Sequence, residues 1–519
     1  MSTIRLKTDQ NRLIANLRHA FNPSSMLGEL LQNARRAQAK HIHVTVDGDT
    51  LTVSDDGIGI DDLQTLIFIA HSGWDDELQA RENAFGLGVL STLYFARYLS
   101  VHSRDKAFHA STATIIRGDG IEVYSEQPRI GTEIRLDGVS LAQARQDLAG
   151  WVELELQRLC QAFPVPVWFN GAEVPRLLVA TDLYWRETSM GKVLINLAGS
   201  TTQWRCFLQG LPIGKVPCYS VHQVILLPEG TLAKLPDRQY LLNETEDHAR
   251  IQKAVSQAYR DALIEQKQSL AASDFIGQFA QKCLDSSNAD LLNDVSFVPR
   301  AWFRDWQSDA AGFRQYRERF MADGIVERTE LEETGIWHIE TDADDSPTAE
   351  VYLEAANAFL FDEPGLDEGH WLRHLIKTVA PEQVLFRTGT TLHRDSSPCL
   401  ADYEVELELV ETLHVRLEGE PEYAVQAFRK GSMLYLTPQA SGVTALVSDY
   451  IFEDRYDEDR EDGDDDNIAT FIAIGCSSSP EHVVQALLPR ALRYLEQPKL
   501  AGASVCLTFD ASGKLQSVQ

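Results

Sequence analysis

The sequence predicts a multidomain α+β protein. Segments whose apolar residues recur every three or four positions, typical of helices, are interspersed with short segments in which apolar and polar residues alternate, typical of strands. At 519 residues the chain is long enough for about three domains of roughly 150 residues each. We expect these domains at 1–145, 146–270 and 271–519.

Composition and charge narrow the classes of function. The content of 44% hydrophobic and 24% charged residues is that of an ordinary globular protein. With 47 basic and 77 acidic residues the net charge is −30, which argues against broad binding to nucleic-acid backbones but leaves a local basic patch open. The seven scattered cysteines show no paired metal spacing, so we expect reduced thiols in a cytoplasmic protein. The start of the chain lacks the apolar core of a signal peptide, and no apolar run approaches the roughly 20 residues that span a bilayer, so we expect no membrane partner.

The first candidate functional residues lie in the helix predicted after Ser24, which follows an amphipathic helix expected at 9–20. Glu29 and Asn33 are four residues apart, so both point to the same side of that helix. The Glu29 carboxylate can orient and deprotonate a water molecule. The Asn33 oxygen can ligate a hard cation such as magnesium. Taken alone, such a pair is more often a solvated helix face.

Two strands, expected at 41–46 and 51–53, lead into the run Asp55-Asp56-Gly57-Ile58-Gly59. Two glycines one residue apart let the backbone turn sharply and approach a ligand closely. Asp55, at the end of a strand, can accept a hydrogen bond from an exocyclic amine. An ordinary Asp-Gly turn is the alternative. His41 and His43 share a strand face, where a packed or solvent-facing role is favoured over a metal pair.

The following stretch combines a polar segment with a glycine-rich turn. A helix expected at 62–69 leads into residues 70–83, whose polar character suits a lid over a ligand. Phe85-Gly86-Leu87-Gly88 opens a helix expected at 89–94, where free N–H groups can face phosphate oxygens. Strands are expected at 99–103, 111–116 and 131–136. In the last of them, the Thr132 hydroxyl could contact a base.

The order E-x-x-x-N, D-x-G-x-G, G-x-G and G-T resembles the GHKL ATPase superfamily of gyrase B subunits, heat-shock protein 90 chaperones, histidine kinases and MutL-type mismatch-repair proteins. The similarity is closest to heat-shock protein 90 and covers residues 1–270. Residues 69–73 (IAHSG) are similar to that family's I-A-K-S-G, and residues 85–91 (FGLGVLS) to its F-G-V-G-F-Y-S. Residues 36–40 (RAQAK) are similar to the D-A-G-A-T of MutL proteins.

The resemblance implies a Bergerat fold, an α/β sandwich with helices layered on one face of a mixed sheet and ATP between. It implies that Glu29 is the general base, Asn33 the magnesium ligand, and Asp55, with Thr132 beside it, the partner of the adenine amine. The other residues it implies at the ATP site are Gly57 and Gly59 around the adenine, Ser72 and Gly73 at the start of the lid, and Gly86, Leu87 and Gly88 over the phosphates.

The sequence departs from the family pattern at three positions. The family's Asp seven residues after the Glu is Arg36 here. Asp56 stands where Asn is usual, and His71 replaces a Lys. None of these changes removes a residue to which the resemblance assigns a catalytic role, but they leave the subfamily open.

Residues 146–270 are expected to form a βαβ-type transducer domain. A helix at 141–162 precedes strands at 165–171, 192–197 and 204–211, and a long helix spans 246–268. The strand at 206–213 is similar to one in the second domain of MutL proteins. In these families a cation at the position of Arg238 reaches the γ-phosphate, where it would stabilise developing charge. A surface arginine in an ordinary ion pair is the alternative for Arg238.

Residues 271–519 are expected to form an α+β region of unknown role. Residues 297–320 are aromatic and basic, as a partner or nucleic-acid surface would be, but a core helix with a basic edge is favoured. Strands are expected at 404–418, 433–436 and 468–474, and a helix at 482–495. The acidic stretch 453–467 predicts a solvated loop, with calcium binding as a minor alternative.

The sequence therefore predicts a slow ATPase that hydrolyses ATP to ADP and phosphate with Mg²⁺. The resemblance implies a chaperone-like or regulatory conformational switch that acts on protein partners and forms an ATP-dependent homodimer through its N-terminal domain. A DNA-processing ATPase resembling MutL or MORC proteins, for example in a bacterial defence system, is one alternative, against which the acidic charge weighs. A nucleotide-dependent scaffold that does not hydrolyse ATP is the other. No phosphoacceptor helix is evident upstream of Glu29, so a histidine kinase is not expected.

Overall fold

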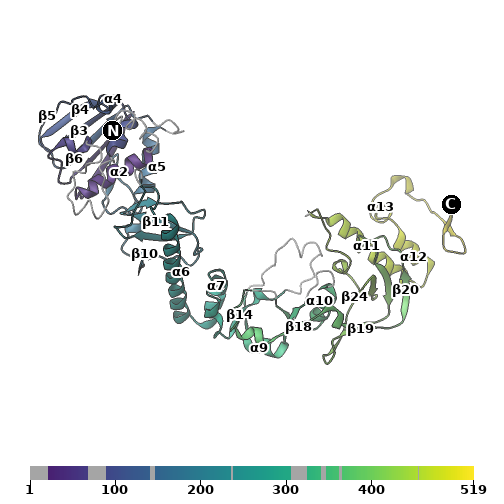
Figure 1. Ribbon diagram of the computed structural model, residues 1–519. Coiled ribbons are helices and arrows are strands. Elements are labelled where there is room, and N and C mark those ends of the chain that lie inside the picture. Colours follow the sequence, from purple (N-terminus) through teal and green to yellow (C-terminus); the bar gives the residue numbers. More distant parts are fainter. Residues whose placement is uncertain are drawn as a thin grey trace, which may run out of the picture. The chain divides into compact units, whose positions relative to one another are not determined.

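The computed structural model describes residues 22–67, 89–140, 147–234, 238–304, 324–340, 346–361, 365–453 and 455–519. The chain divides into two compact units. The N-terminal unit comprises residues 1–269 and 285–288, and the C-terminal unit comprises 270–284 and 289–519. Both mix helices with several sheets, so the α+β class predicted from the sequence is confirmed (Figure 1).

The N-terminal unit contains a mixed eight-stranded sheet in the order β5-β4-β3-β6-β2-β1-β7-β8. Strands β1 and β7 are parallel, whereas the other neighbouring strands run antiparallel. The strands expected at 41–46, 51–53, 99–103 and 131–136 are all present in it. Its strands are β1 (Ile42–Asp47), β2 (Thr50–Asp55), β3 (Tyr98–Ser103), β4 (Lys106–Ser111), β5 (Tyr124–Ser125), β6 (Thr132–Asp137), β7 (Val167–Phe169) and β8 (Ala172–Glu173).

Helices cover one face of this sheet. Ile42 and Val44 of β1 are buried, while His43 and Thr45 between and beyond them are exposed. The buried side packs in one core with leucines of α2 and with Val152 and Leu156 of α5. On the other face, the exposed His41 and His43 rings lie 5.3 and 5.1 Å from the Trp168 ring, and His41 also pairs with Asp56. The helices and 3-10 turns of this part are α2 (Pro23–Arg36), η2 (Leu63–Ile67), η3 (Val89–Tyr94), α4 (Thr112–Arg117) and α5 (Leu148–Leu159).

A second, five-stranded sheet follows in the order β12-β11-β13-β10-β9. The long helix α6 (Glu244–Ser269) packs Ile251 and Val255 into its core, close to the range expected from the sequence. The strands are β9 (Trp185–Thr188), β10 (Gly191–Leu194), β11 (Trp204–Leu208), β12 (Leu211–Ile213) and β13 (Gln223–Leu227).

The expected βαβ arrangement is wrong for the parallel pair in this sheet. Strands β11 and β13 are parallel, but the connecting residues 209–222 form strand β12 and no helix. Gln209 and Gly210 both have positive φ, 53° and 85°. Two such residues in succession form the tight turn of a hairpin, so the chain folds back onto β11 as β12 instead of crossing over as a helix.

Several further elements of the N-terminal unit differ from the expected ones. The strand expected at 111–116 is the helix α4, because the Ser111 side chain accepts a hydrogen bond from the Thr114 N–H and Gly118 ends the helix in a left-handed conformation. The helices expected at 62–69 and 89–94 are the short 3-10 turns η2 and η3. The helix expected at 9–20 lies outside the described residues.

The C-terminal unit contains several small sheets. One core lies between the sheet β20-β21-β25-β24 and helix α11, and another surrounds helix α10. The helices are α7 (Ala272–Asp285), α9 (Arg328–Thr334), α10 (Ser346–Ala355), α11 (Glu458–Gly475), α12 (Pro480–Leu487) and α13 (Arg490–Arg493). The strands are β14 (Phe297–Pro299), β15 (Ile325–Glu327), β16 (Ile336–Ile339), β17 (Phe359–Leu360), β18 (Ile376–Val379), β19 (Leu385–Thr388), β20 (Thr391–Asp395), β21 (Glu406–Val410), β22 (Leu413–Arg416), β23 (Glu422–Ala424), β24 (Ala427–Lys430), β25 (Met433–Leu436), β26 (Ile451–Phe452), β27 (Arg455–Tyr456), β28 (Leu507–Phe509) and β29 (Leu515–Val518).

The acidic loop expected at 453–467 is wrong for most of its length. Residues 458–467 belong to helix α11. Glu461 and Asp464 are each only 4% exposed and share a helix face with Ile468. Neutral donors replace the water that these carboxylates lose, which is what makes their burial tolerable. The donors are the hydroxyls of Thr444 and Tyr456 to Glu461, the Tyr450 hydroxyl to Asp464, and the Ala401 N–H to Asp464.

Three other expectations for this unit change. The strand expected at 468–474 is the second half of α11. The helix expected at 482–495 divides into α12 and α13 at Pro489. Of the aromatic stretch 297–320, the described part begins with strand β14 and buries Trp302, while residues 305–320 lie outside the described residues.

Candidate functional site

Helix α2 places three polar side chains on one face. Asn22 and Ser25 form a reciprocal capping box at its N-terminus, and Pro23 occupies the first helical position. Glu29, Asn33 and Arg36 are separated by four and three residues, so they lie on the same side of the helix. The leucines on the opposite side anchor α2 in the core of the large sheet.

The Glu29 carboxylate lies between two guanidinium groups. Its Oε2 is 3.7 Å from Arg36 Nη1, and its Oε1 is 3.6 Å from Arg238 Nε. The side chains are largely buried, with 11% of Glu29, 3% of Arg36 and 16% of Arg238 exposed. Both separations exceed hydrogen-bond length. The two carboxylate oxygens can therefore still accept hydrogen bonds from a water molecule.

Arg238 reaches Glu29 from the chain that follows the second sheet. Its backbone has a positive φ of 53°, and its N–H donates to the Lys234 carbonyl. The β11–β12 turn is also held against α2, because the Gln32 side chain donates a hydrogen bond to the Gln209 carbonyl in that turn. Gly28 makes this approach close, since a Cβ there would lie 3.3 Å from Leu211. Arg238 is thus in an ion pair, as the alternative expected, but its partner is Glu29 itself.

A cavity of about 60 Å³ lies beside this pair. Glu29 and Arg238 both line it, together with Gly28, Gln32 and residues of β11 and β12. A space of this size holds water molecules, but it is far below the roughly 300–1,000 Å³ of typical ligand pockets. It can supply a water molecule to Glu29 and does not itself accommodate a nucleotide.

The turn after β2 packs onto the end of α2. A Cβ on Gly57 would lie 2.6 Å from the Ala37 carbonyl oxygen and 2.8 Å from the Ala37 Cβ, so only glycine fits there. The Ile58 N–H donates to that same carbonyl at 2.9 Å. Gly57 is therefore fixed against the end of the helix that carries Glu29 and Asn33, and its N–H donates to Asp55 Oδ1 at 2.8 Å.

Gly131 and Thr132 pack against the same turn. A Cβ on Gly131, whose φ is 74°, would lie 1.9 Å from the Asp55 carbonyl oxygen. The Ser103 hydroxyl joins the two segments, because it accepts from the Ile60 N–H, donates to the Gly131 carbonyl and lies 2.9 Å from the Thr132 hydroxyl. The structure thus brings Thr132 to the turn that contains Asp55, with Ser103 between the two segments.

The two neighbouring aspartates have different environments. Burial raises the pKa of Asp55 above its usual 3.8, although hydrogen bonds from the backbone of Gly57 and Thr132 act in the opposite direction. For Asp56 desolvation also raises the pKa, but hydrogen bonds from His41 and from the Lys40 backbone outweigh it and hold the pKa below 3.8. Asp56 is occupied in fixing the start of β1, which leaves Asp55 as the carboxylate facing the interior.

Five of the expected site residues lie outside the described residues, namely Ser72, Gly73, Gly86, Leu87 and Gly88. The expected residues that the structure does bring together form two groups. Glu29, Asn33 and Arg238 form one group, and Asp55, Gly57, Gly59 and Thr132 form the other; the two meet where Gly57 contacts Ala37.

Sequence reasoning missed two residues that belong to these groups. Arg36 donates a hydrogen bond to Asn33 Oδ1 at 3.3 Å and pairs with Glu29. Its spacing from both residues was a readable signal, since three and seven residues return to the same helix face. Ser103 has no motif around it. Only the register of β3 and β6, which places Ser103 opposite Thr132, reveals it.

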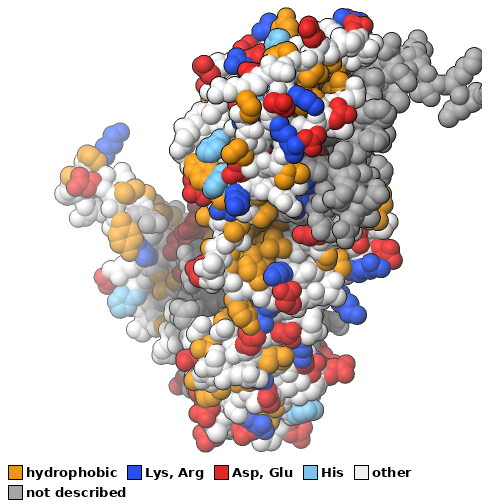
Figure 2. Space-filling model, turned by 90° about the vertical axis from the view of Figure 1, so that its left-hand side faces the viewer, with side chains coloured by type: hydrophobic (Ala, Val, Ile, Leu, Met, Phe, Trp, Pro, Cys, Tyr) orange, Lys and Arg blue, Asp and Glu red, His pale blue; other side chains and the backbone are white. Residues whose placement is uncertain are grey.

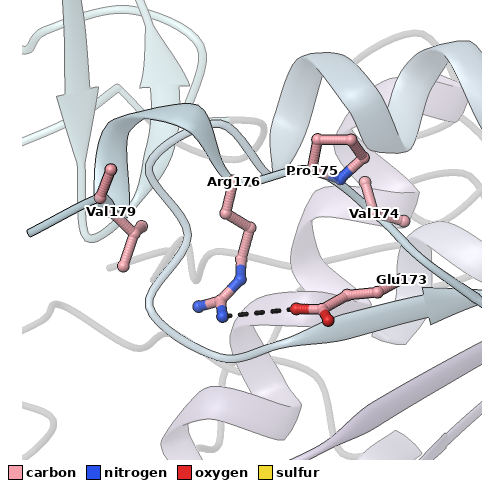
Figure 3. A pocket seen from close by; sticks show the side chains of 6 residues that line it. Glu173, Val174, Pro175, Arg176 and Val179 are labelled. Carbon is pink, nitrogen blue, oxygen red and sulfur yellow. Dashed lines mark ion pairs between the residues drawn. The ribbon is translucent and has the colours of Figure 1, made fainter.

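A larger hollow elsewhere on the N-terminal unit offers less chemistry. It has a volume of about 410 Å³ and is lined by Glu173, Arg176 and four small or apolar residues. Figure 3 shows Arg176 and Glu173 pointing toward each other, with their charged atoms 3.6 Å apart. The two charged side chains that line this hollow form an ion pair with each other. The hollow therefore offers no unpaired charged side chain for catalysis.

The described part of the chain contains neither a metal site nor a membrane span by the following criteria. There, no group of three or more His, Cys, Asp or Glu side chains could hold a metal ion, and no helix is long and apolar enough to cross a bilayer. In Figure 2, basic side chains lie scattered among acidic ones over the face in view. No protein-family model matches the chain, and no curated protein matches it either.

Proposed function

We propose that the N-terminal unit binds ATP and hydrolyses it to ADP and phosphate, in the manner of the GHKL ATPases that its motifs resemble. The observation that carries the proposal is the contact between Gly57 and Ala37. It joins the E-x-x-x-N helix to the D-x-G-x-G turn, although Asn33 and Asp55 are 22 positions apart in the sequence. A mixed sheet with helices on one face also agrees with the proposed Bergerat fold.

The chain's own residues suffice to describe the chemical step. Glu29 accepts a proton from a water molecule in the adjoining cavity as that water attacks the γ-phosphorus. The bond from the γ-phosphorus to the bridging oxygen breaks in line, and ADP leaves. Arg238, already beside Glu29, stabilises the charge on the phosphoryl oxygens. Asp55 holds the adenine amine at the other end of the nucleotide.

The expected magnesium ligand is not free to act as one in this arrangement. Magnesium prefers oxygen ligands and is held in such sites by one or two protein groups, waters and substrate phosphates. Asn33 offers one such oxygen, but that oxygen accepts a hydrogen bond from Arg36 at 3.3 Å. The residues present therefore do not fit the ion without a rearrangement of Arg36, and no step above depends on it.

The proposal is tested by phosphate release from ATP, with wild type beside Glu29→Ala. We expect hydrolysis to fall about 10²–10⁴-fold in the variant, the usual effect of removing a positioned base, while ATP binding stays largely intact. Glu153→Ala removes an exposed carboxylate from α5 and serves as the control that should hydrolyse ATP normally. Equal turnover in wild type and Glu29→Ala would refute the mechanism.

A scaffold that binds ATP without hydrolysis is the second candidate, and one observation favours it. Both oxygens of Glu29 lie 3.6–3.7 Å from guanidinium nitrogens, so these ion pairs compete with a water molecule for the carboxylate. Calorimetry that detects ATP binding, combined with no phosphate release by wild type, would support this candidate over the enzyme.

The wider role follows from the resemblance alone. We infer a chaperone-like or regulatory switch that acts on protein partners and dimerises through the N-terminal domain when ATP binds. A cytoplasmic location is part of this proposal, and all seven cysteines are free thiols, as proteins of a reducing compartment have. Light scattering with and without ATP tests the dimer, since only an ATP-dependent rise in mass agrees with it.

A further inference from the structure

Arg36 occupies the position at which the resemblance expects an acidic residue, and it contacts both polar groups of the site. The same nitrogen, Nη1, lies 3.3 Å from Asn33 Oδ1 and 3.7 Å from Glu29 Oε2. Its side chain is 3% exposed. A guanidinium group buried to this degree needs anionic or acceptor groups around it, and Glu29 and Asn33 are two that it has.

Position, charge and shape make this guanidinium comparable to a bound cation. It lies on the oxygen that a metal ion would ligate, and helix spacing keeps it there. A guanidinium also binds phosphate oxygens through paired N–H groups. Replacing an acidic residue by Arg36 therefore adds a fixed positive charge next to where the nucleotide phosphates would lie.

We propose that Arg36 is the built-in counter-ion of the nucleotide phosphates, so that ATP binds without a divalent cation. Magnesium must then displace Arg36 from Asn33 to reach its ligand oxygen. This inference rests on the proposed nucleotide site and goes beyond it, because it concerns what neutralises the phosphates. It also distinguishes this chain from the GHKL proteins that its motifs resemble, in which this position is acidic.

A purely structural role for Arg36 makes a different prediction. If Arg36 only neutralises the buried Glu29, its replacement should lower the stability of the N-terminal unit and leave the metal dependence of ATP binding unchanged. The decisive readout is therefore the ratio of ATP affinities measured with magnesium and with a chelator. That ratio does not depend on turnover.

The experiment is calorimetric titration of the full chain with ATP, once with millimolar magnesium and once with EDTA. For wild type we expect the two affinities to agree within about threefold. For Arg36→Gln we expect affinity in EDTA to fall about tenfold to a hundredfold, the range for losing a charged hydrogen bond, and magnesium to restore most of it. Arg35→Gln is the matched control, since it removes the same charge from a residue that donates to Gln32.

Each outcome decides the question. Wild-type binding that weakens tenfold or more in EDTA overturns the role of Arg36 and leaves the proposed ATPase intact. An equal loss of affinity for Arg36→Gln in both solutions also overturns it. Absence of ATP binding by wild type in either solution refutes the proposed function itself. If Arg36→Gln does not fold, the wild-type comparison and Arg36→Lys, which keeps the charge but not the paired donors, decide the matter.

Discussion

At the scale of single residues, the candidate site pairs a carboxylate among cations with a carboxylate among neutral donors. Glu29 faces Arg36 and Arg238, whereas Asp55 accepts hydrogen bonds from the backbone of Gly57 and Thr132. The first environment suits a group that works near phosphate charge. The second suits a group that orients a neutral base through hydrogen bonds.

The environment of Asp55 leads to a prediction about binding. Asp55→Asn should weaken ATP binding by about 1.5–3 kcal/mol, the usual value of a hydrogen bond to a charged group, because the amide cannot accept as strongly from the adenine amine. Calorimetry measures it directly. Asp47→Asn, at the exposed end of β1, should bind as wild type does. Unaltered affinity in Asp55→Asn would mean that the adenine lies elsewhere.

The sequence could predict which residues share a face, but not how they interact. The spacing of Glu29 and Asn33 is visible in the letters, and both lie on one side of α2. That Arg36 would take the Asn33 oxygen is a matter of side-chain conformation in a buried site, which no pattern of residue types encodes. Ser103 was missed for a related reason, since its role depends on the register between β3 and β6.

At the scale of elements, the beginning of β6 fixes the turn after β2. Gly131→Ala should prevent this contact, because its Cβ would lie 1.9 Å from the Asp55 carbonyl oxygen and its φ is 74°. Gly118 has nearly the same φ, 77°, but nothing lies within 4 Å of a Cβ there. Gly118→Ala should therefore cost only the strain of the left-handed conformation, about 1–2 kcal/mol.

The difference between these two alanine variants isolates the close contact from the backbone strain. Urea unfolding should show that Gly131→Ala lowers the free energy of unfolding by clearly more than Gly118→Ala. ATP binding should weaken only in Gly131→Ala, since Gly118 lies outside the candidate site. Equal destabilisation by both substitutions would contradict the packing of Gly131 against Asp55.

The sequence predicts helices and strands correctly where the periodicity of apolar residues is strong. The predictions are wrong where local contacts override that periodicity. Helix α6 and strand β25 lie close to where the sequence predicts them. Helix α11 stands where the sequence predicts a solvated acidic loop, because Glu461 and Asp464 recur at helical spacing with Ile468 and are buried with their own donors. The strand expected at 204–211 ends at Leu208, because the two-residue turn of Gln209 and Gly210 reverses the chain into β12.

At the scale of the whole molecule, the division into two compact units predicts two unfolding transitions. ATP, the proposed ligand of the N-terminal unit, should raise the temperature of one of them. Acid should act on the other, because the C-terminal unit encloses His370. This residue is fully buried, its Nδ1 accepts from the Leu372 N–H, and its ring lies 6.1 Å from the Trp302 ring and 5.3 Å from the Trp371 ring.

Burial lowers the pKa of His370 from 6.5 to about 4, although nearby Asp367 acts in the opposite direction. Between these two pH values the unfolded chain binds a proton that the folded unit does not. The contribution of His370 to the free energy of unfolding is therefore constant above pH 6.5 and falls as the pH decreases toward 4, by at most about 3 kcal/mol. Scanning calorimetry from pH 7 to 4 should show the C-terminal transition moving to lower temperature over this range.

Two histidine variants assign this effect. His370→Asn keeps an acceptor near the Leu372 N–H but cannot take up the proton, so its C-terminal transition should depend less on pH than that of wild type. His374→Asn changes an exposed histidine in the same short turn and should preserve the full dependence. An unchanged pH slope in His370→Asn would show that other groups control acid unfolding. A shift of the ATP-sensitive transition instead would place the titrating group in the N-terminal unit.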